Sequence, residues 1–514
     1  MPRSRVVVVG GGLAGMVVAR ELASRGRDVL LLEKSKRLGG KAGANGGIEH
    51  GYHIFPPWYP NVRKILTRLG VPLIDFDRYH YLLPGKFPEK ITIEERGWPA
   101  SLFHNTFQGM MPWYQTVLFF NFVLEMISKP LSQKRLLDRV SQIGLMREAW
   151  YVTEQVAELN QENLLKASAI PAYEMSAMTA KKIAGYWVRT ATPLLSVLPG
   201  DLQSTFIAPL EKEMRSAGVE VRLGVDVKSV EMKNGRVAAL KVRAGGKTER
   251  IPGDLFAITT PLEVTRRFVD GPVHAAAPSL GNTHLLQAQP MSSMHVKLKR
   301  KISGVPREHV FLHGGEYGLS FIDVSQVWKD YSGAGSYLSF IASNFAPLES
   351  VSDDDAIDAM LEEIYEYLPI SKDDLDGRPV LNSNVKVPLF INTIGAWEDR
   401  PDPQTGIPNL VVAGDWVRNA IDLACMEGAV SAALAASAAL LRADGETGAL
   451  PEALVPPVWN RALLLAGRVA FLPVVGVSWA IARVAELFST PKALVPVRAR
   501  NARRKLGRGK AGGS

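Results

Sequence analysis

The sequence predicts an α/β fold with a parallel β-sheet, an inserted α+β domain and a helical appendage near the C-terminal end. Three observations support this prediction. A β-branched run at 5–9 leads into a glycine-rich turn and a helix-forming segment. A second buried strand pattern at 409–413 leads into a helix of small residues, and the segment 463–488 is almost continuously apolar. The 514 residues are enough for two or three domains.

The first 41 residues carry a dinucleotide-binding pattern. The run 5–9 predicts a strand buried on both faces, and 28–33 predicts a second one that ends in Glu33. Between them, Gly10, Gly12 and Gly15 have the G-x-G-x-x-G spacing at the start of a helix. Such glycines permit a tight turn, the close approach of a pyrophosphate and close helix packing, while the acid binds ribose hydroxyls. A glycine-rich turn used only for packing is the alternative interpretation.

A segment near the far end of the chain predicts a second contribution to the same site. The buried strand at 409–413 runs into Gly414 and Asp415, and Met426 opens a long helix of small residues. The N-terminus of that helix would stabilise negative charge on a bound cofactor. Asp415 would bind hydroxyls of the cofactor, and a simple helix cap is the alternative role for it.

Charge and cysteine content limit the function classes. Sixty basic and 51 acidic residues give a net charge of +9, and eight basic residues with no acidic one lie in 491–514. Without these eight the charge falls to +1, so the body is nearly neutral. The tail is either solvated or attracted to anionic lipid, and we expect no nucleic-acid partner. A single cysteine permits no disulfide within the chain, and with no secretory signal expected this favours the cytoplasmic side of a membrane.

Two apolar segments, 110–127 and 463–488, predict peripheral membrane contact. The second is interrupted by Arg468, Arg483 and Glu486 and has Pro473 in its middle. Both segments are therefore too broken to span a bilayer simply and are suited to its interface. Two buried core helices are the alternative interpretation.

The segment Leu38-Gly39-Gly40-Lys41 resembles the G-G-[RK] extension of flavoproteins in the amine oxidase and phytoene desaturase superfamily. In those proteins the backbone and the basic residue approach the phosphates and ribityl chain of FAD. The resemblance implies FAD as cofactor and a Rossmann-like FAD-binding domain of the glutathione reductase and amine oxidase type. Lys41 as an ordinary surface lysine is the alternative.

Further motifs of the same superfamily lie later in the chain. The pairs Gly414-Asp415 and 426–429 (Met-Glu-Gly-Ala) are similar to its C-terminal FAD motif. The stretch 254–261 matches its returning strand, and Val227 matches a valine whose backbone meets the adenine. An ordinary core role is equally compatible with Val227.

The segment 49–61 (E-H-G-Y-H-I-F-P-P-W-Y-P-N) is the most specific motif. It resembles the E-x-G-x-H-x-F…Y-P-N segment of the plant and cyanobacterial phytoene and ζ-carotene desaturases, and the resemblance extends from about residue 5 to 441. It implies dehydrogenation of a long isoprenoid lipid by hydride transfer to flavin N5, with a quinone as acceptor. It also implies catalytic roles for His53 and Arg189, with structural roles as the alternative.

The motifs and the resemblance together assign a set of residues to the cofactor. These are Gly10, Gly12, Leu13, Ala14, Gly15, Glu33, Lys34, Gly40, Lys41, Gly51, Tyr52, His53, Val227, Gly414, Asp415, Met426 and Ala429. No metal is expected, because His50 and His53 have H-x-x-H spacing without a second cluster. The acids at 353–355 predict a helix N-terminus rather than a metal site.

Departures from the family pattern leave the identity of the substrate undetermined. Pro56 and Pro57 replace two phenylalanines, and Trp416 replaces a tyrosine. Cys425 stands where amine oxidases commonly place a cage tyrosine, which counts against a flavin amine oxidase. That activity, an isoprenoid isomerase and a non-enzymatic prenyl-lipid carrier remain the alternatives.

The motif positions predict three regions. A discontinuous FAD-binding domain comprises 1–75, 205–272 and 400–445; a substrate domain comprises 76–204 and 273–399; the appendage is 446–514.

Overall fold

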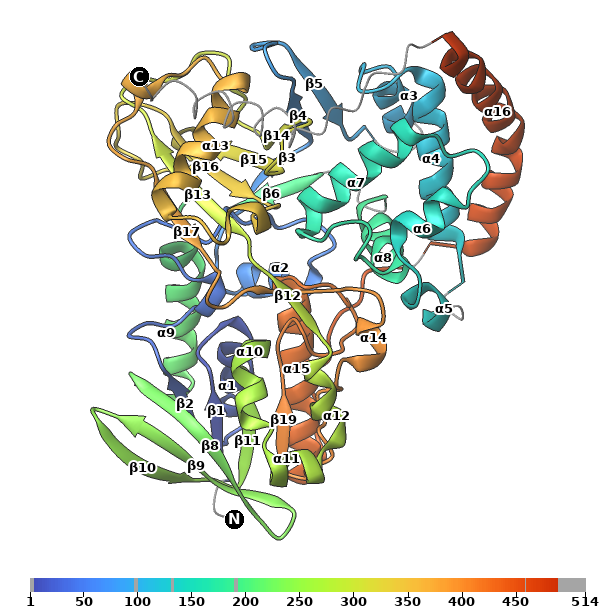
Figure 1. The fold of residues 1–514 in the computed structure, drawn as a ribbon. Helices are drawn as coiled ribbons and strands as arrows, with labels where there is room; N and C mark the ends of the chain where they lie inside the picture. The colour runs from blue at the N-terminus through green and yellow to red at the C-terminus, as the bar shows by residue number, and fades with distance from the viewer. Residues whose placement is uncertain (1–3, 97–99, 131–133, 189–192, 458, 489–514) are drawn as a thin grey trace, which may run out of the picture.

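A computed structural model describes residues 4–96, 100–130, 134–188, 193–457 and 459–488. The basic tail and Arg189, both singled out from the sequence, lie outside the described residues. The chain forms a lower body around a parallel sheet and an upper body around a larger mixed sheet (Figure 1).

The parallel sheet of the lower body confirms the predicted α/β fold. Its five strands, in spatial order, are β19 (Leu410–Val412), β11 (Leu255–Ile258), β1 (Arg5–Val9), β2 (Asp28–Glu33) and β7 (Glu220–Leu223). All four pairings are parallel. The order places the late strand β19 two positions from β1, with only β11 between them. The runs of buried valine and leucine in β1 and β2 suit a sheet covered on both faces.

Helices and a second small sheet surround the parallel sheet. Helix α1 packs against α15 and α9, and an antiparallel ribbon follows β7 (Figure 1). These elements are α1 (Leu13–Ala23), α9 (Ala208–Ser216), α15 (Met426–Ala443), β8 (Val225–Lys233), β9 (Arg236–Ala244) and β10 (Lys247–Pro252). Asn234 and Gly235 join β8 to β9 with φ of 52° and 73°, as the Asn-Gly pair of a type I′ hairpin requires.

The upper body is built on a seven-stranded sheet that is antiparallel except where β14 pairs with β4. Its strands, in order, are β17 (Val380–Ser383), β13 (Ser292–Lys297), β16 (Tyr337–Ala342), β15 (Leu319–Asp323), β14 (Val310–Leu312), β4 (Arg78–Leu82) and β5 (Lys90–Glu94). Helix α13 (Asp353–Tyr367) begins at the N-cap Ser352, whose hydroxyl accepts from the Asp355 N–H, so the acids at 353–355 lie in a first helical turn as predicted.

A group of helices completes the upper body beside this sheet (Figure 1). They are α3 (Ala100–Thr106), α4 (Trp113–Ser128), α5 (Lys134–Asp138), α6 (Gln142–Arg147), α7 (Glu154–Ser168) and α8 (Ala177–Val188). Shorter elements connect the two bodies or border them. They are α2 (Pro60–Arg68), β3 (Ile74–Phe76), β6 (Leu195–Val197), α10 (Leu262–Thr265), α11 (Gly271–Ala276), α12 (Pro278–Gly281), β12 (Gln287–Gln289), β18 (Leu389–Ile391) and α14 (Ala396–Asp399).

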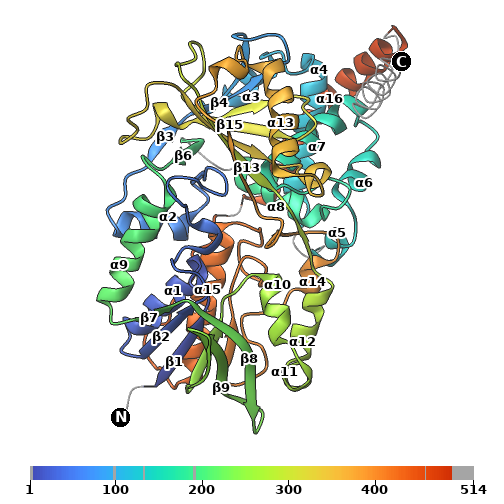
Figure 2. The same cartoon turned by 60° about the vertical axis from the view of Figure 1, so that its left-hand side comes forward.

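The last described element, α16 (Arg461–Phe488), is one continuous helix that packs along α4 at the outer edge of the molecule (Figures 1 and 2). The sequence suggested a more broken segment, but Pro473 lies within the helix without ending it. By length and composition, α15 and α16 are the described helices that could cross a bilayer. The most apolar stretch of α15 is 67% buried, as in a core helix, whereas that of α16 is only 17% buried.

Candidate functional site

One cavity of about 1380 Å³ extends from the carboxyl edge of the parallel sheet into the helices of the upper body. Its lining comes from the turn after β1, the start of α15, the segment 50–54, and helices α4, α7 and α8. Typical small-molecule pockets have about 300–1,000 Å³. The volume is therefore enough for a dinucleotide together with a second molecule.

The glycine turn after β1 is tightly packed on one side and open on the other. Gly10 has φ of +103°, and a Cβ on Gly15 would lie 1.9 Å from the Gly10 carbonyl oxygen. A Cβ on Gly12 would meet no atom closer than the Gly40 Cα at 4.0 Å. Helix α1 starts at Gly12 without a side-chain cap, so its first N–H groups remain free to bind an anion in the cavity.

Glu33 is fixed at the end of β2 by two backbone donors. Its Oε2 accepts from the Gly11 N–H at 2.6 Å and its Oε1 from the Ser35 N–H at 2.7 Å. The Gly39 N–H donates to the Gly11 carbonyl at 2.8 Å, which holds the second glycine segment against the first. Both segments line the cavity, so the sequence-predicted Gly10, Gly12, Leu13, Ala14, Glu33, Gly40 and Lys41 lie at one end of it. Gly15 lies behind the turn.

The late segment reaches the same end of the cavity. The Ala413 N–H donates to the Ile258 carbonyl at 3.0 Å, and Gly414 and Asp415 follow directly at the sheet edge. Met426 and Ala429, in the first turn of α15, line the cavity as well. Two helix N-termini, those of α1 and α15, therefore converge on one space, although more than 400 residues of sequence lie between them.

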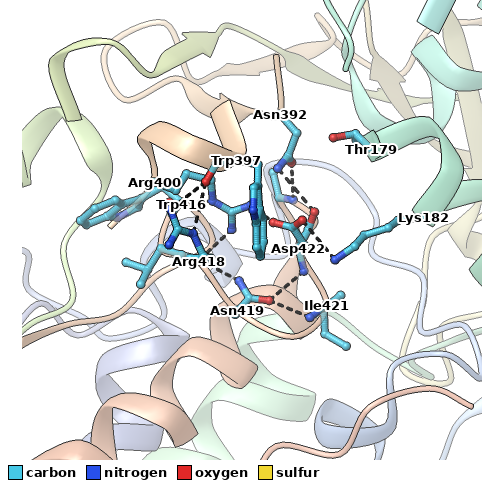
Figure 3. A network of polar contacts seen from close by, with 12 residues as sticks. Thr179, Lys182, Asn392, Trp397, Arg400, Trp416, Arg418, Asn419, Ile421 and Asp422 are labelled. Atoms are coloured by element: carbon cyan, nitrogen blue, oxygen red, sulfur yellow. Dashed lines mark hydrogen bonds and ion pairs between the residues drawn. The ribbon is translucent and has the colours of Figure 1, made fainter. Parts of the chain in front are cut away.

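A buried arginine holds the loop that leads from β19 to α15 (Figure 3). The Arg400 guanidinium is fully buried; it pairs with Asp422 and donates to the Val417 carbonyl at 2.7 Å and the Trp416 carbonyl at 3.1 Å. Lys182 of α8 approaches the second Asp422 oxygen at 3.1 Å. The network joins the loop to the upper body.

A buried carboxyl joins α15 to the start of α2. The Glu427 carboxyl accepts from the backbone N–H groups of Asn61 and Val62, each at 2.9 Å. It therefore caps the N-terminus of α2, which its own N-cap residue does not do. Burial raises the pKa of Glu427 to about 7, although these N–H donors act in the opposite direction. These hydrogen bonds attach the end of the 49–61 segment to the first turn of α15.

The 49–61 segment places its first half in the cavity. Gly51, Tyr52 and His53 all line it, and His53 Nδ1 lies 3.3 Å from Glu49 Oε2. Burial lowers the pKa of His50 to about 4, so this cavity-lining imidazole is neutral near pH 7.

Lys34, Lys41 and Val227 also line the cavity, and the two lysines have partners within the protein. Lys41 Nζ donates to the Pro388 carbonyl at 2.7 Å, and Lys34 forms an exposed ion pair with Asp226 at 3.6 Å. Val227 lines the cavity from β8. The Trp416 indole donates to the Thr260 carbonyl at 3.0 Å and is buried.

Sequence reasoning missed the residues of the upper cavity. The far end is lined by aromatic and aliphatic residues of α4 and α8 and by polar residues of α6 and α7. The apolar character of 110–127 was visible in the sequence, but nothing in it indicated which face of α4 meets a cavity.

Comparison with known protein families gives one match over most of the chain. The model of the flavin containing amine oxidoreductase family matches residues 13–441. The 15-cis-phytoene desaturase of Arabidopsis thaliana is 25% identical over 83% of this chain and 78% of its own length. A probable zeta-carotene desaturase of Synechococcus elongatus is 23% identical over 86% of this chain and 99% of its own length.

Solved structures show the same fold. A putrescine oxidase bound to putrescine matches with a TM-score of 0.63 and 15% identity, over 86% of this chain and 99% of its own. The cyclohexylamine oxidase of Brevibacterium oxydans matches with a TM-score of 0.59 and 14% identity, over 86% of this chain and all of its own.

The lower end of the cavity fits FAD, the cofactor of the matched family. Open space at Gly12 and the uncapped start of α1 suit a pyrophosphate, and the fixed Glu33 carboxylate suits ribose hydroxyls.

Two glycine variants separate cofactor contact from packing. We expect Gly12→Ala to leave the stability of the apoprotein within about 0.5 kcal/mol, because its Cβ meets open space. Its FAD affinity should fall roughly tenfold or more, since the methyl group occupies the approach of the phosphates. Gly15→Ala should lower both the stability of the apoprotein and its FAD affinity, because a Cβ there would clash with the Gly10 carbonyl oxygen. Urea unfolding and FAD titration of each apoprotein measure them, and wild-type FAD affinity in Gly12→Ala would contradict the assignment.

Proposed function

The chain belongs to the flavin containing amine oxidoreductase family, and we propose that it desaturates a long isoprenoid lipid with a quinone as electron acceptor. One observation carries this proposal: the lower end of the cavity, which fits FAD, continues into a large and mainly apolar upper end. The relatives named as phytoene and zeta-carotene desaturases support the isoprenoid class. The net reaction removes two hydrogens from adjacent carbons and reduces the quinone to a quinol.

Apolar side chains of α4 and α8 form much of the upper cavity. Phe119, Phe120 and Val123 of α4 line it together with Ile183 and Trp187 of α8. Such a surface binds a hydrocarbon chain by excluding water and can align one C–H bond with the cofactor.

The chain's own residues orient and stabilise rather than react. FAD, when bound, supplies the hydride acceptor. The N-terminus of α15 would stabilise negative charge at the same end of the cavity. We propose that His53, held by Glu49, and Arg189 act near the reacting carbons, and that 1–75, 205–272 and 400–445 form the FAD domain.

We also propose that the protein takes its substrate from a membrane surface through α16 and α3. Ten large apolar side chains of α16 are exposed: Leu463, Leu465, Val469, Leu472, Val474, Val477, Ile481, Val484, Leu487 and Phe488. Phe103 of α3 and Phe107, which follows that helix, are exposed as well. Helix α16 packs on α4, whose other residues line the cavity, so a lipid would travel a short path.

Membrane contact through α16 is tested by vesicle flotation. We expect Val469→Asp/Val477→Asp to reduce the fraction bound to phosphatidylcholine–phosphatidylglycerol vesicles several-fold, because both exposed valines would enter the lipid interface. Val380→Asp, at an exposed valine of β17, is the matched control and should float like wild type. Equal flotation of all three proteins would exclude α16 as the contact.

The reaction is tested by anaerobic incubation of the FAD-loaded protein with polyprene hydrocarbons, with and without a quinone. We expect loss of the yellow flavin absorbance without quinone, its return when quinone is added, and products lighter by two hydrogens. Products of unchanged mass but altered retention would show isomerisation instead. Hydrogen peroxide formed from amines, with no change in the lipid, would show an amine oxidase.

A further inference from the structure

The upper cavity contains a group of polar side chains that a hydrocarbon substrate leaves unexplained. Asn160, Asn163 and Lys166 of α7 line it, together with Gln142 of α6 and Tyr81 of β4. Asn160 and Lys166 are six residues apart, which is about 9 Å along a helix. We call these five residues the polar end.

Direct hydrogen bonds connect members of the polar end. The Gln142 amide donates to Asn160 Oδ1, and the Tyr81 hydroxyl donates to Asn163 Oδ1 at 2.8 Å. Gln142 is completely buried, yet its Oε1 has no donor within the part of the chain that the structure describes. Buried polar atoms are normally hydrogen-bonded, so an unpartnered acceptor on a residue of the cavity lining points to a ligand that donates to it.

The charge of Lys166, the charged member of the polar end, is compensated by Glu162 of the same helix. Lys166, buried, is paired with Glu162 and donates to the Leu312 carbonyl at 2.6 Å. Glu162 is also 2.6 Å from His313 Nδ1. A carboxylate or phosphate ligand would need an uncompensated cation in the protein. The arrangement therefore favours an uncharged ligand that donates a hydrogen bond.

A second group of hydrogen-bonded residues also lines the cavity. Tyr52 is hydrogen-bonded to His309 and, at 2.7 Å, to Ser320 Oγ, and all three residues line the cavity. Burial lowers the pKa of His309 to about 3, so it is neutral. These three residues have one another as partners. Among the described residues that line the cavity, three buried side-chain atoms lack a partner: His50 Nε2, Asn384 Nδ2 and Gln142 Oε1, of which only the last is a carbonyl oxygen.

We propose that the substrate is an isoprenoid alcohol whose hydroxyl group donates a hydrogen bond to Gln142 at the polar end. This inference rests on the proposed function and narrows its substrate class from a hydrocarbon to a hydroxyl-bearing lipid. Phe311, whose ring stacks on that of Tyr81 with centroids 5.2 Å apart, also lines the cavity and suits the adjoining unsaturated chain.

Three matched lipids test the inference with the FAD-loaded full-length protein in one nonionic detergent. They are geranylgeraniol, its methyl ether and the hydrocarbon in which hydrogen replaces the hydroxyl. Tryptophan fluorescence titration gives the dissociation constants. We expect the alcohol to bind about 10- to 100-fold more tightly than the ether and the hydrocarbon, because only the alcohol can donate to Gln142.

Variants assign the preference to Gln142. Gln142→Leu should bind the alcohol and the hydrocarbon equally. Because it leaves Asn160 without its donor, Gln142→Leu/Asn160→Leu is the second variant, in which both partners are apolar. Gln115→Leu is the control, since Gln115 is a buried glutamine bonded to Thr153 outside the cavity lining, and it should keep the preference.

The outcomes separate this inference from the proposed function. Equal wild-type affinity for the alcohol and the hydrocarbon overturns the inference and leaves the proposed isoprenoid substrate intact. Binding of none of the three lipids overturns both. A preference for the alcohol that survives in both Gln142 variants overturns the assignment to the polar end.

Discussion

The pairing of β11 with both β1 and β19 is the constraint on which the site depends. Val9 lies opposite Ile258, and Ile258 lies opposite Val412, so the three strands end at one level. Because the strands are parallel, the turns that follow β1 and β19 emerge at the same edge of the sheet, where open α/β sheets bind their ligands. A cofactor that contacts both turns therefore links the first and last parts of the family-matched chain.

Two buried ionisable groups keep the late segment in place above that edge. Arg400 binds the carbonyls after β19 and pairs with Asp422 (Figure 3). Glu427 caps α2 from the first turn of α15. Removing one member of such a buried pair leaves an uncompensated charge, which is strongly destabilising. These contacts give the loop from 414 to 425 a fixed path without regular secondary structure.

Local sequence patterns predicted the lower body well because each was determined by neighbouring residues. The valine run, the glycine spacing and the acid at Glu33 predicted β1, α1 and β2, and Asn234-Gly235 predicted the hairpin. The polar end could not be predicted, because Gln142, Tyr81 and Asn163 meet only through tertiary packing of separate elements. For the same reason the sequence did not show that Lys41 would reach the Pro388 carbonyl, or that α16 would continue through Pro473.

The central claim is that one FAD molecule is held by two distant segments, and hydrogen–deuterium exchange of the apoprotein with and without FAD tests it most directly. Amides within 10–16 and within 414–429 should both become protected on addition of FAD, with the same dependence on its concentration. Protection confined to 10–16, with unchanged exchange in 414–429, would contradict the account.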